Sequence, residues 1–174
     1  VVSRLLALVQ PSHLHLGEKD WQQLQVLRRL VHDLRWPVQI VPCPTLRERD
    51  GVPLSSRNAY LSVEQRQQAA LLPQALAQGQ QLLDAGQRQA EPLLRAVRAL
   101  MEDGGLAVDY LQLVDLPRLQ ELEQVTGPAL LAAAVRCGEA RLIDHRVELG
   151  QWCKQAFLAK FGQRVMSTRD HRDI

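Results

Sequence analysis

Apolar residues fall at helical spacing at the beginning of the chain. Val2, Leu5, Leu6 and Val9 share one face of a helix, and Pro11 cannot continue it because proline lacks the backbone amide. The pattern predicts a short helix with one apolar face.

The following segment predicts a strand, a helix and a second strand. Residues 13–16 alternate, a helix is expected over residues 21–34, and residues 38–41 form a short β-rich run. Asp20 stands at the N-cap position of the helix, with Gln23 three residues later as in a capping box. This is the βαβ unit of a parallel sheet, where ligands bind beyond the carboxyl ends of the strands.

A polar, irregular stretch over residues 42–58 is typical of a connector and a loop, and we place a domain boundary there. A capping-box spacing at Ser62 begins a helix that ends at Gly86, with a kink expected at Pro73. A further helix is predicted around residues 93–101.

The period then changes to that of strands. Three strands are predicted over residues 108–114, 129–135 and 142–149, with a short helix over residues 117–123. Strands this close in sequence favour antiparallel pairing, so the second half is predicted to be an α+β unit. Residues 150–174 have weak periodicity and are expected to be a tail or a linker.

Composition indicates a folded, unexported protein. Apolar residues make up 46% of the 174 residues and charged residues 23%, as in ordinary globular chains. Lys and Arg number 21 against 19 Asp and Glu, so no nucleic-acid partner is expected. The longest apolar run, residues 129–135, is far shorter than the roughly 20 residues of a membrane helix, so no membrane partner is expected either. The three cysteines lack CxxC spacing, which favours a reducing cytoplasm.

Several familiar catalytic motifs are absent from the sequence. It contains no GxGxxG, no GxxxxGK[ST], no HExxH and no GxSxG. The five histidines are scattered without the spacing of metal ligands, so no metal site built from protein side chains is expected.

Two polar segments are candidate ligand sites. Residues 17–20 place a glycine, a cation and a carboxylate between a strand and a helix N-terminus, where anions are favoured. Residues 55–58 offer two hydroxyls, a guanidinium and an amide, all suited to phosphate. From the residues alone, the first segment also fits a solvated helix start and the second a polar turn.

The order of these motifs resembles the pantothenate synthetase family (pantoate–β-alanine ligase), a branch of the nucleotidyltransferase superfamily related to class I aminoacyl-tRNA synthetases. The resemblance covers about residues 1–149. It is carried by Gly-Glu-Lys-Asp-x-Gln-Gln at 17–23, Pro-Thr-x-Arg-Glu-x-Asp-Gly at 44–51, Leu-Ser-Ser-Arg-Asn-x-Tyr-Leu-Ser at 54–62, Val-Asp-Tyr-Leu at 108–111 and Ala-Arg-Leu-Ile-Asp at 140–144.

The resemblance implies an α/β fold. Residues 1–45 would be the C-terminal part of a Rossmann-like nucleotide-binding domain, a βαβ remnant. Residues 46–149 would be a small α+β C-terminal lid domain with an antiparallel sheet, and residues 150–174 a tail or linker. In some cyanobacterial relatives the ligase is fused to a cytidylate kinase, and the tail would then join the two.

The implied activity is a ligase reaction of pantothenate biosynthesis, in the coenzyme A pathway. Pantoate attacks ATP to give pantoyl adenylate and pyrophosphate, and the amine of β-alanine then displaces AMP. ATP would be a substrate, with Mg²⁺ bound through its phosphates. Such a reaction needs positioning and charge stabilisation rather than a protein nucleophile. The complete enzyme would be a cytoplasmic homodimer acting on small molecules.

The resemblance also assigns roles to residues near the helix start. Lys19 would contact the phosphates of ATP, while Asp20 and the backbone of Gly17 would hold the ribose hydroxyls. Gln23 would hydrogen-bond pantoate, and the adjacent Gln22 also suits a polyhydroxy acid.

The loop would complete the ATP site. Ser55, Ser56 and Arg57 would correspond to the mobile KMSKS loop of the superfamily and clamp the triphosphate. The backbone near Leu46 and Leu54 would border adenine. The predicted catalytic residues are therefore Lys19, Ser55, Ser56 and Arg57.

A feature of the family is missing from the sequence. Members carry a Met-Gly-x-Leu-His-x-Gly-His segment whose histidines bind ATP, and no His-x-x-His occurs here. We therefore expect a truncated C-terminal part of the enzyme that is inactive alone. The alternatives are a non-catalytic nucleotide-binding or interaction fragment, or another adenylyl or cytidylyl transferase of the superfamily.

One geometric prediction tests the site directly. If both segments bind ATP, Lys19 and Arg57 must face each other across one cleft and converge on a common anion site.

Overall fold

The computed structural model describes residues 1–116 and 118–148. The described helices and strands are, in order, α1 (Val2–Val9), β1 (His13–Gly17), α2 (Trp21–Asp33), β2 (Gln39–Cys43), the 3₁₀ helix η1 (Ser56–Tyr60), α3 (Val63–Ala69), α4 (Leu71–Asp84), α5 (Ala90–Asp103), β3 (Ala107–Asp115), β4 (Ala129–Cys137) and β5 (Ala140–Glu148). None of the described helices is long and apolar enough to cross a membrane.

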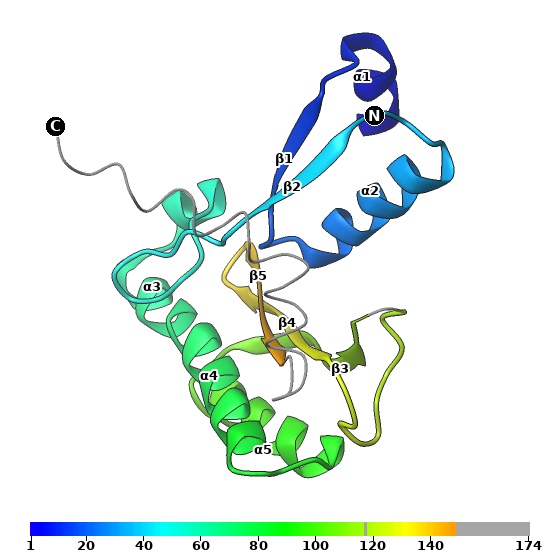
Figure 1. Ribbon diagram of the computed structural model, residues 1–174. Coiled ribbons are helices and arrows are strands. Elements are labelled where there is room, and N and C mark those ends of the chain that lie inside the picture. Colours follow the sequence, from blue (N-terminus) through cyan, green and yellow to red (C-terminus); the bar gives the residue numbers. More distant parts are fainter. Residues whose placement is uncertain (117, 149–174) are drawn as a thin grey trace, which may run out of the picture.

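The first sheet consists of β1 and β2, which run side by side (Figure 1). They are parallel, in a register from His13 opposite Gln39 to Gly17 opposite Cys43, with α2 as the crossover. The side chain of Asp20 accepts a hydrogen bond from the backbone amide of Gln23 at 3.2 Å, which caps α2. The predicted βαβ unit and its N-cap are confirmed.

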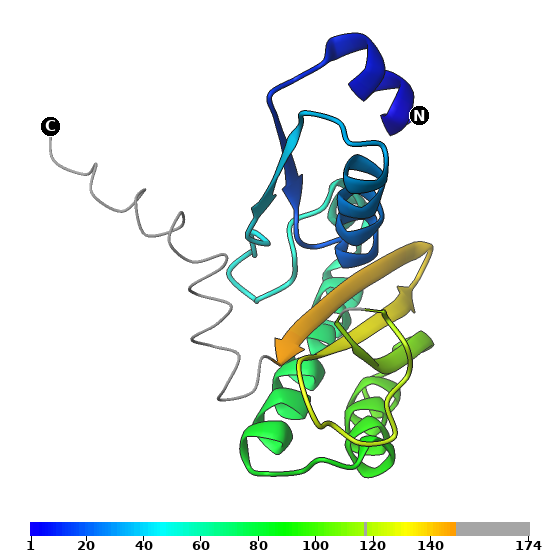
Figure 2. The same ribbon diagram turned by 45° about the vertical axis from the view of Figure 1, so that its right-hand side comes forward.

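The second sheet has the order β3-β4-β5 and is antiparallel throughout. Its strands follow one another through short connections, as the sequence pattern predicts. Helices α4 and α5 cover one face of this sheet (Figure 2). The predicted α/β fold class, with an antiparallel sheet in the second half, is confirmed.

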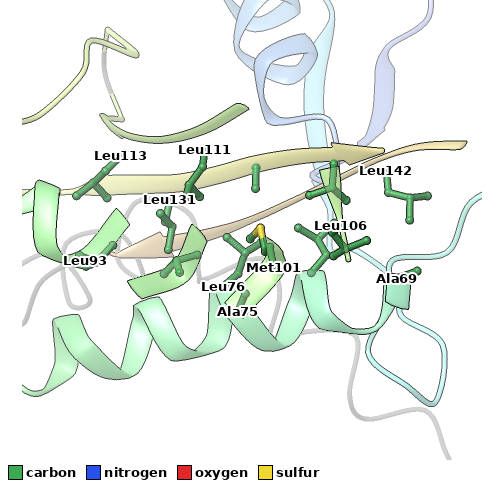
Figure 3. Close-up of a cluster of buried hydrophobic side chains, with 14 of the residues drawn as sticks. Ala69, Ala75, Leu76, Leu93, Met101, Leu106, Leu111, Leu113, Leu131 and Leu142 are labelled. Carbon is green, nitrogen blue, oxygen red and sulfur yellow. The ribbon is translucent and has the colours of Figure 1, made fainter. Parts of the chain in front are cut away.

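The main core lies between this sheet and the two helices, as Figure 3 shows. Leu76 of α4, Leu93 and Met101 of α5, and Leu131 of β4 are all fully buried. The core is aliphatic, as expected from a chain with only 4% aromatic residues.

The opposite face of the sheet packs on the βαβ unit. Trp21 and Leu24 of α2 form a smaller buried cluster with Val114 of β3 and Leu130 of β4. Because successive strand residues point to opposite faces, Leu113 enters the main core while Val114 enters this cluster. The N-terminus of α2 therefore sits over the sheet.

The prediction of one helix kinked at Pro73 is wrong in detail. The structure has two helices, with α3 ending at Ala69 and α4 beginning at Leu71. A proline ring clashes with the carbonyl four residues earlier, which here belongs to Ala69. The chain responds by breaking between the helices, and Pro73 then occupies the first turn of α4, where proline is tolerated.

The helix predicted over residues 117–123 is also wrong for the part that the structure describes, residues 118–123. Glu121 pairs with Val114 in an antiparallel bridge, and the amide of Leu122 donates to the carbonyl of Leu113 at 2.9 Å. The carboxylate of Asp115 accepts from the amide of Gln120 at 2.7 Å. Backbone groups of this segment thus form hydrogen bonds with the edge of β3 and not with one another, as they would in a helix. The end of the third predicted strand and the tail over residues 150–174 lie outside the described residues.

Candidate active site

The carboxyl end of β1 places the first candidate segment. The amide of Glu18 donates to the carbonyl of Cys43 at 2.8 Å, which continues the ladder between β1 and β2 by one step. Two residues later Asp20 caps α2. Lys19 is therefore held between a sheet and a helix start, both of which fix its backbone.

The second candidate segment follows a hairpin that we name the 46–54 hairpin. The amide of Leu54 donates to the carbonyl of Leu46 at 2.8 Å, and the amide of Glu48 donates to the carbonyl of Val52 at 2.9 Å. Gly51 closes the turn with a φ of +85°, a conformation that side chains other than glycine rarely adopt. The hairpin leads directly into Ser55, whose hydroxyl accepts from the amide of Arg57 and caps η1.

Asn58 of η1 and Arg66 of α3 hold the hairpin through its carboxylates. The side-chain amide of Asn58 donates to a carboxylate oxygen of Glu48 at 2.6 Å and to the carbonyl of Pro53 at 3.1 Å. Arg66 forms ion pairs with Asp50 at 2.6 Å and with Glu48 at 2.8 Å. The bonds from Asn58 and Arg66 lower the pKa of Glu48, and the bond from Arg66 lowers that of Asp50. Asn58 thus shapes the loop through its bonds to Glu48 and Pro53.

A cavity of about 380 Å³ lies between the two candidate segments, and we name it the loop cavity. Lys19 also reaches across with its ammonium, which donates to the carbonyl of Leu54 at 3.4 Å. Lys19 and Arg57 line one cavity, as predicted, and a common anion site there stays a prediction. The polar residues that line the loop cavity are Gly17, Lys19, Asp20, Ser55, Arg57, Asn58 and Arg141.

The electrostatics of the loop cavity favour an anion. Burial lowers the pKa of Lys19, and the nearby charge of Arg57 lowers it further. The carboxylates of Asp144 and Asp20 act in the opposite direction but do not cancel these effects. A bound phosphate would supply the missing negative charge between the two cations.

A second cavity, of about 370 Å³, lies between the start of α2 and the sheet, and we name it the sheet cavity. Lys19, Asp20, Arg141 and Ile143 line both cavities, so the two are neighbours along one wall. The other polar residues lining the sheet cavity are Gln22, Tyr110, Gln112, Asp144 and His145.

Arg141 was not among the predicted site residues. Its Nε donates to a carboxylate oxygen of Asp109 at 2.7 Å, and its guanidinium lies 5.7 Å from the centre of the Tyr110 ring. These contacts fix its orientation between the two cavities. Arg141 and Tyr110 belong to motifs that the family resemblance included, but residue type and spacing alone gave them no role.

Arg47 and Asp144 form another pair that sequence reasoning missed. The guanidinium of Arg47 donates to both oxygens of the Asp144 carboxylate, at 2.7 and 2.9 Å. This bidentate pair joins the 46–54 hairpin to β5, and the bond to the carboxylate raises the pKa of Arg47. In the sequence, Arg47 belongs to the stretch predicted as a connector and loop and to the 44–51 motif of the resemblance, and neither gave it a role.

Some predicted site residues lie outside the residues that line either cavity. Leu46 is 71% exposed and Leu54 is 57% exposed, although the carbonyl of Leu54 contacts Lys19. Ser56 and Gln23 have exposed side chains, and it is Gln22 that lines the sheet cavity. Their roles stay predictions.

Residues 1–147 match the family model of pantoate-beta-alanine ligases. The chain is 99% identical over 147 residues to a bifunctional pantoate ligase/cytidylate kinase of Synechococcus sp. (strain RCC307), a match that covers 84% of this chain and 29% of that protein. It is 49% identical over 152 residues to the pantothenate synthetase of Myxococcus xanthus (strain DK1622), covering 86% of this chain and 52% of that protein.

Two solved structures are similar in both sequence and fold. Pantothenate synthetase from Thermus thermophilus has a TM-score of 0.79 and 44% identity, over 83% of this chain and 52% of that one. Pantoate-beta-alanine ligase from Francisella tularensis, complexed with beta-gamma ATP and beta-alanine, has a TM-score of 0.60 and 30% identity, over 84% of this chain and 47% of that one. The chain thus spans between 29% and 52% of the length of these relatives.

Proposed function

Because this chain belongs to the pantoate-beta-alanine ligase family, we propose that it contributes to the ATP-dependent ligation of pantoate and β-alanine. The observation that supports this most directly is the loop cavity, where Lys19 and Arg57 face each other from segments far apart in sequence. A cavity lined by three cationic side chains, Lys19, Arg57 and Arg141, and one carboxylate, Asp20, suits the triphosphate of ATP.

The proposed reaction has two steps. In the first, a carboxylate oxygen of pantoate bonds to the α-phosphorus of ATP, and the bond from that phosphorus to the leaving pyrophosphate breaks. In the second, the amine of β-alanine bonds to the acyl carbon of pantoyl adenylate and loses a proton, and AMP leaves with the former carboxylate oxygen. Both steps need charge stabilisation and alignment rather than a covalent bond to the protein.

The residues of this chain would act on the phosphates and the sugar. Lys19 and Arg57 stabilise the negative charge that develops on the phosphates, and the hydroxyls of Ser55 and Ser56 donate hydrogen bonds to the same oxygens. Asp20 and the backbone of Gly17 hold the ribose hydroxyls. Support for this orientation comes from the position of Gly17, Lys19, Asp20, Ser55 and Arg57 around one cavity.

The remaining contacts are proposed from the family. The backbone near Leu46 and Leu54 borders adenine, and Gln23 hydrogen-bonds pantoate. Gln22 lines the sheet cavity together with Lys19, and Gln23 is the next residue along α2. An amide that donates and accepts is suited to the hydroxyl groups of pantoate.

Mg²⁺ would be bound through the phosphates of ATP. Among the described residues, no group of three His, Cys, Asp or Glu side chains is placed to hold a metal ion. We propose that the cation takes oxygen ligands from the phosphates of ATP and from water, and that it neutralises phosphate charge there.

The proposed partners are small molecules only, without a nucleic acid or a membrane. Positive and negative residues are nearly balanced, 21 against 19, so the composition lacks the excess of basic residues that is typical of polyanion-binding proteins. We also propose that the full-length enzyme is a cytoplasmic homodimer, divided into domains near residue 45. Light scattering on the purified protein tests the dimer.

The function is tested by following AMP release from ATP by the full-length protein with Mg²⁺, pantoate and β-alanine. AMP should appear only when all substrates are present. Labelled pyrophosphate should exchange into ATP when pantoate alone is added, because this isolates the first step. ATP binding without exchange would instead support a non-catalytic nucleotide-binding fragment. Exchange with CTP, or with another acid, would support a different nucleotidyltransferase.

A further inference from the structure

We propose that Arg47 and Asp144 are positioning residues. Their ion pair fixes the position of the 46–54 hairpin, and of the phosphate-binding groups that follow it, relative to Lys19. The inference rests on the proposed function, since it concerns the same site. It is carried by the bidentate ion pair between hairpin and sheet.

Asp144 is unusual among the described residues. It is 2% exposed and is the one charged residue in their buried set. Burying a carboxylate is unfavourable unless charge and hydrogen bonds compensate for the lost water. Arg47 supplies the charge, and the backbone amide of His145 donates to the same carboxylate at 2.8 Å. Because Asp144 belongs to β5 and accepts from Arg47 through both oxygens, β5 fixes the position of the guanidinium.

Arg47 also holds its own hairpin. The nitrogen Nη1 that donates to Asp144 donates to the carbonyl of Gly51 as well, at 2.9 Å. A single guanidinium therefore ties the turn of the hairpin to the strand. Two parallel bonds to a carboxylate fix an orientation as well as a distance, which a lysine at this position would not do.

The position of the hairpin decides where the phosphate-binding groups lie. Its second arm ends at Leu54, whose carbonyl contacts the ammonium of Lys19, and the chain then enters Ser55. Asp144 lines the sheet cavity beside Lys19, and its negative charge acts on that ammonium. Arg47 thus holds the hairpin side of the loop cavity through its backbone, and the charge of Asp144 acts on Lys19 on the other side.

A purely structural role predicts a different outcome, and Arg66 provides the comparison. Arg66 holds the same hairpin through ion pairs with Asp50 and Glu48, but it does so from α3 rather than from β5. If the hairpin only needs an anchor, Arg47→Lys and Arg66→Lys should have similar effects. If the position of the hairpin relative to Lys19 matters, only Arg47→Lys should alter the kinetics of adenylation.

The first measurement does not depend on activity. Hydrogen exchange is followed at the amides of Glu48 and Leu54, which bond across the hairpin. In Arg47→Lys, exchange should accelerate about tenfold at these amides, while amides in the α4 and α5 core keep their protection. Unchanged exchange at Glu48 and Leu54 would overturn the inference, whether or not the protein is a ligase.

The second measurement is pantoate-dependent pyrophosphate exchange in the full-length protein. Arg47→Lys should lower kcat by roughly 10- to 100-fold when measured well below its unfolding midpoint, because misplaced binding groups reduce the rate strongly. Arg66→Lys should lower the midpoint and keep kcat within about twofold. Equal kcat losses in both variants would overturn the inference.

Asp144→Asn provides a second variant, because the amide keeps the shape and loses the charge. Its kcat should fall as in Arg47→Lys, and the double variant should fall no further, since both changes remove one interaction. Additive losses would contradict the proposed link. A wild-type protein without exchange activity would refute the proposed function alone, and hydrogen exchange would still decide on the hairpin.

Discussion

The ammonium of Lys19 donates a hydrogen bond of 3.4 Å to the carbonyl oxygen of Leu54. The contact joins the turn between β1 and α2 to the end of the 46–54 hairpin, which immediately precedes Ser55 and Arg57. Two segments with no local interaction in the sequence thereby become the two walls of one cavity.

Lys19→Ala should lower the rate of pantoyl adenylate formation by about two to three orders of magnitude, as loss of one charge-stabilising donor typically does. Stability should hardly change. Burial and the charge of Arg57 already lower the pKa of Lys19, so its removal relieves an unfavourable charge. Single-turnover kinetics and thermal melts of the full-length protein measure both effects. Arg29→Ala, an exposed cation farther along α2, is the control and should leave the rate unchanged. Near-normal adenylation by Lys19→Ala would leave residues 17–20 as a solvated helix start.

Asp20→Ala should reduce both stability and ATP affinity. The side chain of Asp20 caps α2, and loss of an N-cap costs about 1 kcal/mol. Asp20→Ser separates the two effects, because serine retains a capping oxygen but has no carboxylate for the ribose. Calorimetric binding of ATP and thermal melts should show a stable Asp20→Ser protein with weakened ATP binding. If Asp20→Ser binds ATP as the wild type does, Asp20 is a cap and has no ribose contact.

Acid should destabilise the protein through the carboxylates around Arg66. Hydrogen bonds from Asn58 and Arg66 hold the pKa of Glu48 below its ordinary range, and Arg66 does the same for Asp50. Because the folded-state pKa is the lower one, this stabilisation is present above about pH 4 to 5 and is lost as the pH falls through the folded-state values. Arg66→Gln should lower the melting temperature at pH 7 and make its decline toward pH 3 shallower.

The control for that experiment is Arg98→Gln, which removes an exposed pair with Glu102 on α5. Exposed pairs of this kind contribute little to stability, so its melting temperature should follow the wild type at every pH. An unchanged pH profile in Arg66→Gln would show that the ion pairs around the hairpin do not stabilise the fold.

Gly79→Ala should destabilise the core although alanine favours helices. A Cβ at this buried position of α4 would lie 2.5 Å from Cδ2 of Leu131 and 2.9 Å from Cγ2 of Val97. Overpacking of this kind costs about 1 to 3 kcal/mol, against a gain of about 1 kcal/mol in helix propensity. We expect a net loss of roughly 1 kcal/mol in denaturant unfolding. Gly127→Ala, where a Cβ meets no atom within 4 Å, should be near neutral. A stabilised Gly79→Ala protein would mean that Leu131 and Val97 move aside freely.

Local signals in the sequence predicted much of the fold. The cap at Asp20, the stop at Pro11 and the alternation around residues 13–16 act within a few residues, and the structure has α1, β1 and α2 where they indicate. The same kind of reasoning failed where hydrogen bonds to a distant strand competed. Within residues 118–123, Glu121 pairs with the edge of β3 and residues 119, 120 and 122 form hydrogen bonds to it, so no helix is formed there.

The candidate site divides in the same way. Residues 17–20 and 55–58 were recognisable because each places phosphate-directed groups at a helix start or in a turn. Tyr110 and Arg141 were missed, since neither stands out by type or spacing. They line the sheet cavity because β3 and β5 both pair with β4, which brings their side chains together.

Apart from the helix predicted over residues 117–123 and the break before α4, the sequence by itself determined the order of helices and strands, the parallel and antiparallel sheets and the two polar segments, because these depend on interactions between near neighbours and on hydrophobic periodicity. Only the tertiary structure decided that Lys19 and Arg57 share a cavity and that Arg47 pairs with a carboxylate 97 residues away. The packing of α2 on the sheet, through Trp21 and Leu24, brings the two segments together. No pattern of neighbouring residues encodes such a distance, because it results from how complete elements bury their apolar faces.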